Sequence, residues 1–368
     1  MSNMTEYNGI YAFHPGYFVK QIIDDAGVTQ DDFANRLGVT GKSLSELVNG
    51  KINLSKDMAL ALSCMLGNSV DMWLGLQKNY EQRIMEIESK KRVDVQKPLL
   101  KIIDYGYFVK HAHLQEFRKA EDKVRGLCAC MRIASLCLLG DDSRMAGYPI
   151  KAENMEPKNA ICSRAWLLFA LSQGNEARIK GKVDTDRLTQ FVPEIRDLTI
   201  QGVNESIPRL KAIFQECGVT FVCLPALKDA AVMGVVKWAA DRKSVTLAIN
   251  DRTKTEDSFW IVLLHQIWHV LQRSYNQTYI ALDSDDSQMN DQEKEADTFA
   301  KNILILPKDY DRLLANGDFS LSTIRKAGTS LHIHLGIIAA RMASEKLISP
   351  QVANQMRKPF RLRSVPHE

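Results

Sequence analysis

The sequence predicts a multidomain protein with an all-α N-terminal domain, a helical connector and an α+β domain in the C-terminal half. Short amphipathic helical patterns follow one another at the start of the chain. Helical periodicity without a recognisable motif continues through the middle, and strand-like runs appear only later. A chain of 368 residues can form about two or three domains, each with its own core. The expected domains are 1–90, 91–186, 187–310 and 311–368, the last a helical segment.

The composition is that of an ordinary globular protein, with 45% hydrophobic and 25% charged residues. No apolar stretch approaches the roughly 20 residues that a membrane helix needs, and the N-terminus lacks the pattern of a signal peptide. The seven cysteines are scattered, which favours reduced thiols in a cytoplasm over a disulfide framework. Because the net charge of +4 is mild, any affinity for nucleic acid must come from a local basic patch.

The segment 17–80 divides into short amphipathic helices with clear start and stop signals. Thr29 begins a capping-box pattern before one helix, and Gly38 opens a tight turn at the end of that helix. Thr40 then caps a second helix. Two short helices around a turn of about three to four residues form a helix-turn-helix unit, whose second helix enters the major groove of DNA.

The outward face of this second helix carries short polar and basic side chains, which can reach base edges and phosphates. A small helical bundle with a polar surface would explain the helices, but not a turn of this length followed by such a face. We therefore expect DNA contacts from Gln30 at the start of the first helix, and from Thr40, Lys42, Ser43, Ser45 and Lys51 in and beside the second.

Residues 14–85 resemble the XRE-type helix-turn-helix domains of the HigA antitoxin family. The matching pieces are HPGYFVKQII, VTQDDFANRLGV, LSELVNGK and DMWLGLQKNYE. The resemblance implies a DNA operator, which we expect to be near-palindromic and read by a homodimer because helix-turn-helix units usually read paired half-sites. Gly41 departs from the family pattern, which has a longer polar residue there, and this would remove one base or phosphate contact.

The middle of the chain offers no motif with a recognisable chemistry. Residues 82–100 are polar and charged, which predicts the end of the first domain and a linker. Residues 101–183 carry helical periodicity with a turn-rich gap, GDDSRMAGYP. We expect a helical connector there, whose cysteines are small core residues.

The organisation changes in the C-terminal half. A helix that ends at Gly218 is followed by strand-like runs with turn residues between them, and then by a second helix. This order predicts an α+β domain with a short antiparallel sheet. The strand-like runs are 219–225, 232–238 and 244–249.

The second helix contains LLHQIWH, in which two histidines are four residues apart. In a helix His265 and His269 project from one face, so both imidazoles can bind one tetrahedral zinc at about 2.0–2.1 Å. A catalytic zinc needs one more protein ligand, and Glu295 in EKEADTFAKNILILP adjoins an apolar stripe. A carboxylate directed at a core indicates a cation there, whereas Glu293 should lie nearer the exposed start. Histidines that fill a core or a surface are the alternative for the pair alone.

Residues 188–310 resemble the ImmA/IrrE family of zinc metallopeptidases, which are gluzincin-like enzymes with a His-Glu-x-x-His helix. The matching pieces are FVPEIRDLT, GVVKW, DSFWIVLLHQIWHVL and EKEADTFAKNILILP. The resemblance implies a zincin-like fold in which His265, His269 and Glu295 bind Zn²⁺. It also implies substrates among transcription repressors or antitoxin-like proteins, cleaved under stress in a bacterial or phage regulator.

Gln266 stands where this motif has its general-base glutamate. That glutamate takes a proton from the attacking water and later gives it to the leaving amine. Glutamine has nearly the same shape but cannot accept the proton at neutral pH, so metal binding should survive while turnover falls by orders of magnitude. Loss of the base alone, by an isosteric change, favours a deliberate inactivating substitution over a naturally inactive form.

Two further parts of the expected active site are less defined. VMGVVKW should provide the edge strand of a substrate cleft, along which an extended peptide can pair. Trp238 is a candidate to line that cleft, although a tryptophan at the end of a strand is more often a core residue. The residue that stabilises the oxyanion stays open among Tyr275, Tyr279, His332 and His334.

The sequence therefore predicts a cytoplasmic, DNA-binding transcription regulator fused to a zinc endopeptidase, which cleaves a repressor, an antitoxin-like protein or itself. The alternative is a HigA-like antitoxin and autorepressor that binds a cognate toxin. In that case the non-catalytic peptidase fold is only a docking surface. Restoring the glutamate at Gln266 and testing for proteolysis separates these two hypotheses.

Overall fold

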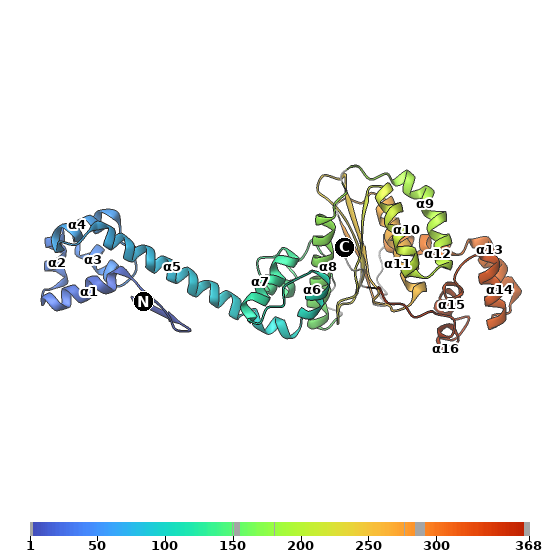
Figure 1. Cartoon of the computed structure of the whole chain (residues 1–368), viewed down its shortest axis with the longest axis horizontal. Coiled ribbons are helices and arrows are strands. Elements are labelled where there is room, and N and C mark those ends of the chain that lie inside the picture. Colours follow the sequence, from blue (N-terminus) through green and yellow to red (C-terminus); the bar gives the residue numbers. More distant parts are fainter. Residues whose placement is uncertain are drawn as a thin grey trace. The chain divides into compact units, whose positions relative to one another are not determined.

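The computed structural model describes residues 3–148, 150, 155–179, 181–275, 277–283 and 291–363. The chain forms two compact units, Met1–Val95 and Gln96–Glu368 (Figure 1). The first boundary therefore lies at Val95, five residues beyond the predicted one. No described helix is both long and apolar enough to cross a membrane.

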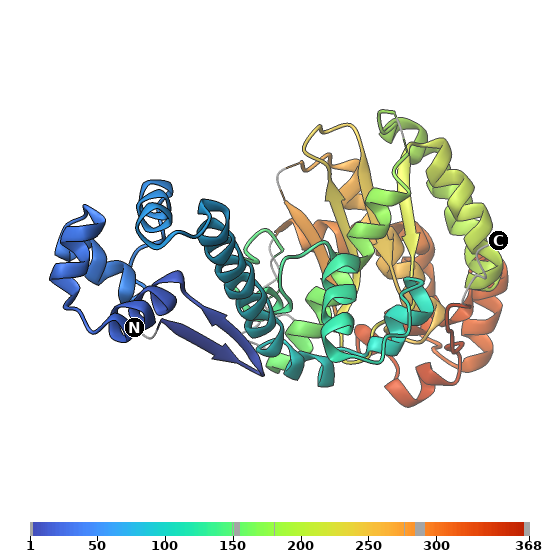
Figure 2. The ribbon, with the colours of Figure 1, turned by 60° about the vertical axis from the view of Figure 1, so that its left-hand side comes forward.

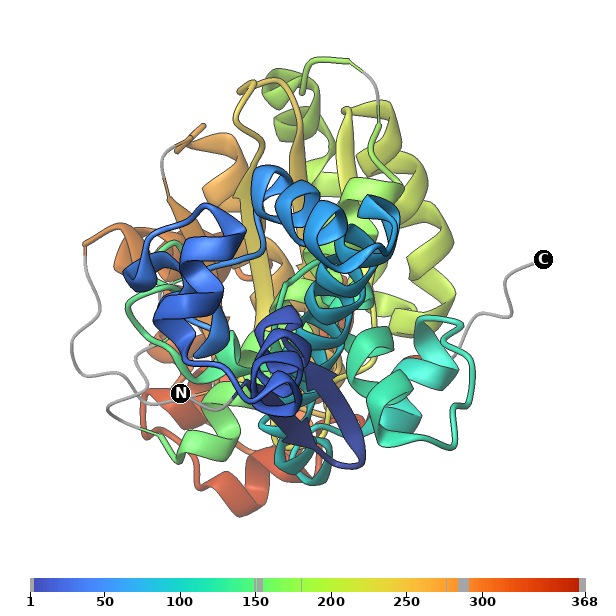
Figure 3. The same cartoon turned by 90° about the vertical axis from the view of Figure 1, so that its left-hand side faces the viewer.

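The first unit is a helical domain with a β-hairpin at its N-terminus (Figure 3). The hairpin was not predicted, although Asn8-Gly9 between alternating residues is a recognised hairpin signal. Both turn residues have positive φ, +50° at Asn8 and +77° at Gly9. The elements are β1 (Met4–Tyr7), β2 (Ile10–Phe13), α1 (Pro15–Ala26), α2 (Gln30–Leu37), α3 (Gly41–Val48), α4 (Lys56–Leu66) and α5 (Val70–Asp94).

The predicted capping signals of the first unit are confirmed. The Thr29 hydroxyl accepts the Asp32 N–H before α2, and the Thr40 hydroxyl accepts the Ser43 N–H before α3. Gly38 ends α2 with φ +75°, a value that favours glycine. One apolar core joins these helices, with Phe33, Leu44, Leu47, Leu62 and Trp73 among its buried side chains.

The expected linker at 82–100 is helical over most of its length, because α5 continues to Asp94. Its Glu, Lys and Arg residues are good helix formers even though they are charged. Ile87 anchors this part of the helix, since it is buried against Ile10 and Ala12 of the hairpin. A polar composition therefore indicated exposure here, but not the end of the helix.

The second unit contains a four-stranded sheet in the order β3-β5-β4-β6 (Figure 2). β3 (Val219–Cys223) pairs parallel to β5 (Val245–Ile249), and β4 (Val232–Trp238) pairs antiparallel to both β5 and β6 (Thr278–Leu282). The prediction of an antiparallel sheet is therefore wrong for β3, which follows α10 (Val203–Glu216). After β3 the chain passes β5's position and forms β4, and β5 then returns between β3 and β4, antiparallel to β4 and parallel to β3. The edge-strand prediction for VMGVVKW is also wrong: β4 lies inside the sheet, whose edges among the described residues are β3 and β6.

Helices cover both faces of this sheet. α8 (Pro157–Glu176) lies on one face, and α10 and α11 (Glu256–Leu271) lie on the other (Figure 1). α12 (Asp291–Leu304) packs against α11. The other helices are η1 (Lys97–Lys101), α6 (Tyr105–His111), α7 (Ala120–Met131), η2 (Leu136–Gly140), α9 (Thr185–Asp197), η4 (Leu198–Ile200), α13 (Pro307–Asn316), α14 (Leu321–Leu331), α15 (Leu335–Ser344) and α16 (Pro350–Asn354).

The predicted connector and C-terminal segment belong to the same compact unit as the sheet. Trp166 of α8 donates its indole N–H to the carbonyl oxygen of Pro225 at 2.9 Å, just beyond β3. Ile338 and Phe360 are buried in the core that contains α11. Segments 91–186 and 311–368 are therefore not separate domains. Apart from the end of α5, they help to build the domain that carries the histidines.

Candidate metal centre and nucleic-acid interface

The helix α11 presents both histidines from a buried position between the sheet and α12. Its first turn carries two acidic residues, Glu256 and Asp257, which suit the positive end of a helix dipole. His265 and His269 are 7% and 1% exposed. A helix this apolar is stable only when it is covered on nearly all sides, and that burial shields the imidazoles from bulk water.

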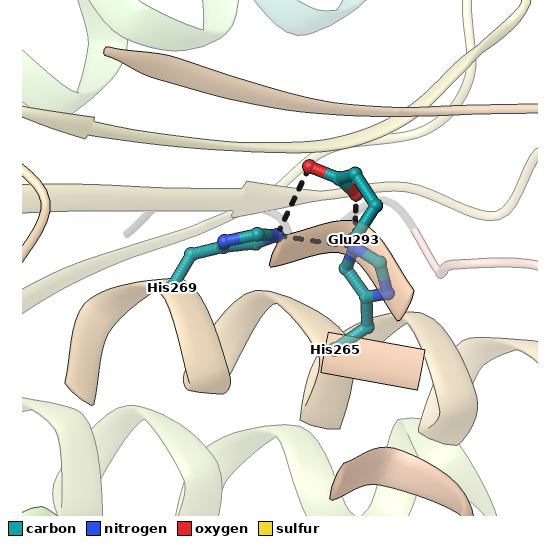
Figure 4. A group of neighbouring side chains, drawn as sticks. All are labelled: His265, His269 and Glu293. Carbon is teal, nitrogen blue, oxygen red and sulfur yellow. Dashed lines mark hydrogen bonds and ion pairs between the residues drawn. The ribbon is translucent and has the colours of Figure 1, made fainter. Parts of the chain in front are cut away.

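Glu293 of α12 meets the two imidazoles (Figure 4). His265 Nε2 lies 2.9 Å from one carboxylate oxygen of Glu293, and His269 Nε2 lies 3.4 Å from the other. The two Nε2 atoms are 3.2 Å apart. Three donor atoms from two helices therefore converge on one point.

The predicted third ligand, Glu295, is not the residue that reaches the histidines. Its side chain lines an outer hollow with Trp268 and Phe299. The reason is helical geometry, because the buried stripe of α12 contains Ala296, and Glu293 lies one turn before it on the same face. Glu295 is rotated about 100° away from Ala296.

Helical spacing in the sequence could have identified Glu293. The position lies three residues before Ala296 and seven before Ala300, which is the spacing of a single helix face. Its place near the start of the helix suggested exposure, and Asp291, Gln292 and Lys294 in that turn are indeed exposed, but Glu293 faces α11. The side chain of Glu293 is only 24% exposed.

Asp297, one turn after Glu293, holds the outer nitrogen of His265. The distance from His265 Nδ1 to Asp297 Oδ1 is 2.7 Å. A carboxylate on the outer nitrogen of a histidine fixes the ring and makes the other nitrogen a better metal donor. No role is predicted for Asp297 from the sequence, although its spacing from Glu293 places both on one helix face.

The acidic neighbours determine the charge states of the site. Burial lowers the pKa of His265, but hydrogen bonds to Asp297 and Glu293 outweigh burial and raise this pKa to about 9. Burial raises the pKa of Glu293, but hydrogen bonds to both histidines and their charges lower it to about 2. Burial also lowers the pKa of His269, which keeps that imidazole neutral.

The residues present fit a zinc ion. Two ligands of a tetrahedral zinc with bonds of about 2.0–2.1 Å lie about 3.3 Å apart. The two Nε2 atoms are 3.2 Å apart, and each lies 2.9 or 3.4 Å from one of the two Glu293 oxygens, so the separations lie around that value. Two imidazoles and one carboxylate also form a donor set typical of catalytic zinc sites.

Gln266 is entirely buried between α11 and the sheet, at 0% exposure. Within the described part of the chain, neither its amide oxygen nor its amide nitrogen has a hydrogen-bond partner. Gly234 of β4 leaves room for this side chain because it has no Cβ. A Cβ added there would lie 3.4 Å from the Gln266 Cγ and 3.1 Å from the Ala248 carbonyl oxygen. An unpaired buried amide costs about 1–3 kcal/mol, so this position is not optimised for stability alone.

The other predicted cleft residues lie in different surroundings. Trp238 is buried in the core at 5% exposure, with its ring against Tyr275, so the cleft prediction for it is not supported. His332 ends α14 and His334 caps α15, where it accepts the Gly336 N–H. Among the four oxyanion candidates, Tyr279 is the one whose ring contacts a metal-site histidine.

The predicted DNA-contact residues all lie on α2 and α3 or at the ends of α3. Thr40 and Ser43 also have structural roles, since the Thr40 hydroxyl caps α3 through the Ser43 N–H. Lys42 is open to solvent, with a side chain 83% exposed and a long ion pair of 4.0 Å to Glu46. Ser45 is partly buried, whereas Lys51 is exposed, and Gln30 is partly buried at the start of α2.

Gly41 has a local explanation in this arrangement. A Cβ at this position would lie 2.8 Å from an Asp31 carboxylate oxygen. α2 and α3 therefore approach closely at this point, and a larger residue would require Asp31 to move.

Comparison with known proteins bears on this N-terminal region. Residues 19–73 match the family model described as helix-turn-helix. The chain is 33% identical over 81 residues to the uncharacterized HTH-type transcriptional regulator YddM of Escherichia coli strain K12, covering 22% of this chain and 82% of that relative. It is 41% identical over 69 residues to virulence-associated protein A′ of Dichelobacter nodosus, covering 18% of this chain and 60% of that protein.

Two solved structures share a segment of similar length with this chain. One is described as an antidote protein of a plasmid maintenance system from Nostoc punctiforme, 30% identical, with a TM-score of 0.22 over 23% of this chain and 91% of that one. The other is an addiction module antidote protein of a HigA family from Coxiella burnetii, 22% identical, with a TM-score of 0.21 over 23% and 94%. Scores this low do not define the fold of the present chain.

The sequence relatives and the local geometry of this region agree. The matched residues 19–73 contain the capped α2–α3 pair, and YddM is covered over most of its length. Through this N-terminal domain the chain belongs to the helix-turn-helix family of DNA-binding transcriptional regulators.

Proposed function

We propose that this regulator carries a zinc-binding, metallopeptidase-like domain in its C-terminal unit, and that Gln266 keeps its peptidase activity very low. The observation that supports the proposal is the convergence of His265, His269 and Glu293 from two packed helices. The second helix also supplies Asp297 as the outer partner of His265. A chance pair of core histidines would need neither carboxylate.

Each residue of this site would have a different role in peptide hydrolysis. A bound zinc ion supplies Lewis-acid chemistry, which polarises a carbonyl and activates water. His265, His269 and Glu293 hold the ion, and Asp297 orients His265. Gln266 stands at the general-base position and cannot take up a proton, so substrate can bind while the proton transfer that completes hydrolysis is lost.

Metal analysis tests this proposal directly. Protein stripped with a chelator and then dialysed against zinc should contain one tightly bound zinc per chain, measured by elemental analysis. The variant His269→Ala should lose that zinc while its helix-turn-helix domain stays folded. A protein that retains no zinc after this treatment would end the peptidase-like proposal, but not the assignment as a regulator.

Zinc affinity should increase with pH up to about pH 9. The metal-free His265 holds a proton below its pKa of about 9, and zinc must displace that proton from the nitrogen that faces Glu293. Displacement of one proton makes the apparent affinity rise by up to about tenfold per pH unit below the pKa, and level off above it. His269, whose pKa is lowered, adds no proton to release in this range.

This pH dependence can be measured by competition with a chromophoric chelator between about pH 6.5 and 9. Calorimetry in two buffers of different ionisation enthalpy should count about one proton released at pH 7. A zinc affinity that does not change with pH would contradict the charge state assigned to His265.

We propose that α3 enters the major groove and that Lys42 contacts a phosphate. Lys42→Ala should weaken binding to duplexes of different sequence by a similar factor, and should reduce the slope of log affinity against log salt by about 1. Lys78→Ala, an exposed lysine of α5, is the matched control and should change neither quantity. Fluorescence anisotropy over a salt series measures both. Equal slopes for the wild type and Lys42→Ala would exclude the phosphate contact.

A near-palindromic operator and a homodimer complete the regulator proposal. Paired half-sites about one helical turn apart are the usual target of helix-turn-helix dimers. Selection from random duplexes, followed by sedimentation of the complex, would show whether two chains occupy one site. The proposed protein substrate is a repressor or antitoxin-like protein, or the chain itself.

One observation favours a second candidate function, an antitoxin that binds a cognate toxin. Gln266 stands at the general-base position and cannot take up a proton. The C-terminal unit would then serve as a docking surface. A complex with the product of a neighbouring gene, together with absence of proteolysis by the Gln266→Glu variant, would favour this function over the peptidase.

A further inference from the structure

Tyr279, on the edge strand β6, contacts both helices of the candidate metal centre. Its ring stacks on the imidazole of His269, with 3.9 Å between ring centroids and 15° between ring planes. Its hydroxyl donates a hydrogen bond to Gln292 Oε1 at 3.1 Å. Gln292 immediately precedes Glu293 in α12. One buried side chain, 4% exposed, therefore links β6, α11 and the first turn of α12.

The two histidines are held by different means. His265 is fixed by a carboxylate on its outer nitrogen, at 2.7 Å from Asp297. The hydrogen bonds of His269 among the described residues all involve the inner nitrogen, Nε2, which faces His265 and Glu293. Among the described residues, the flat contact with Tyr279 covers the face of the His269 ring and restrains its plane.

We propose that Tyr279 is a positioning residue for the metal centre, which it serves through His269 and Gln292; this inference rests on the zinc site proposed above. Ring stacking limits rotation of the imidazole, so that the lone pair of Nε2 stays directed at the ion. The hydrogen bond to Gln292 holds the start of α12, which carries Glu293. Outer partners of metal ligands typically contribute about 10–100-fold to metal affinity.

Three variants separate the two contacts of Tyr279 from simple burial. Tyr279→Phe keeps the stacked ring and removes the hydroxyl, whereas Tyr279→Leu keeps an apolar side chain and removes the flat ring. The matched control is Tyr310→Leu, because Tyr310 is also 4% exposed and its hydroxyl also has a side-chain acceptor, Glu345, at 2.6 Å. Tyr310 lies on α13, where its side chain contacts Glu345 and Arg341 rather than the residues of the candidate metal centre.

Zinc affinity, measured by chelator competition, should fall about 10–100-fold in Tyr279→Leu and only a few-fold in Tyr279→Phe. The visible spectrum of the cobalt-substituted protein should change in Tyr279→Leu and stay close to wild type in Tyr279→Phe. The melting temperature is measured in the presence of a chelator, so that no zinc is bound. Under this condition it reports only the stability that is lost with the buried side chain. Tyr310→Leu should lose stability in that measurement and keep its zinc affinity.

The possible outcomes distinguish this inference from the function on which it rests. If the wild type binds zinc and Tyr279→Leu binds it as tightly as Tyr310→Leu does, Tyr279 has no positioning role and the zinc site stands. If the wild type binds no zinc, both proposals fail. Should Tyr279→Leu not fold, Tyr279→Met, which also lacks a flat ring, takes its place with the same expected loss.

Discussion

Gln266→Glu should raise the rate of peptide hydrolysis by the zinc-loaded protein about 10²–10⁴-fold, the usual contribution of a general base. The substitution replaces a buried amide, which cannot take a proton, with a carboxylate of nearly the same shape. Because Gln266 is 0% exposed, the new carboxylate depends on the nearby cation to compensate for its burial. We therefore also expect the variant to melt below wild type without zinc, and to recover more stability than wild type when zinc is added.

A quenched-peptide library and the product of a neighbouring gene are suitable substrates for this measurement. Gln272→Glu, at the exposed C-terminal end of the same helix, is the matched control and should leave hydrolysis at the wild-type rate. Addition of a chelator should abolish the gained activity. If Gln266→Glu binds zinc normally and cleaves neither the library nor the chain itself, the peptidase assignment fails and the antitoxin hypothesis gains support.

Glu293→Gln should weaken zinc binding by at least about 10²-fold, which is more than the loss typical of an outer partner. The carboxylate supplies both a donor atom and a negative charge, and its two oxygens lie 2.9 and 3.4 Å from the two Nε2 atoms. An amide oxygen keeps the shape but removes the charge. Chelator competition at pH 8 measures the loss.

Glu295→Gln is the control for this prediction, because it is the same change two residues away on the same helix. Glu295 lines the hollow beside Trp268 and Phe299, so its loss should leave zinc affinity within about twofold of wild type. The reverse result, a large loss in Glu295→Gln and none in Glu293→Gln, would mean that α12 is rotated relative to the arrangement described above.

Local signals in the sequence were sufficient for most of the first unit. Thr29, Gly38 and Thr40 mark caps and a turn that involve residues within four positions of one another, and all three act as expected. The β-hairpin was missed although Asn8-Gly9 signalled it, because strands of four residues offer little alternation. The predicted linker at 82–100 is wrong over most of its length, because charged residues that are exposed can still form a helix, as they do in α5 up to Asp94.

In the second unit, local sequence signals did not predict the order of the strands in the sheet. Three strands were identified from their composition, but β6 was missed, and with it the inner position of β4 in the sheet. Strand order depends on pairing between residues that are far apart in the chain, which no local pattern encodes. The position of Trp238 in the core follows from that order.

By itself, the sequence determined the helix-turn-helix domain, the spacing of His265 and His269, and the missing base at Gln266. These features depend on residue type and on the period of a single helix. Only the tertiary structure decided that Glu293 rather than Glu295 meets the imidazoles, and that Asp297 and Tyr279 hold them. The physical reason is that a helix face acquires its partner only through packing. Glu293 and Glu295 are two residues apart, about 200° around the axis of α12, so the packing of α12 against α11 decides which of them meets the histidines.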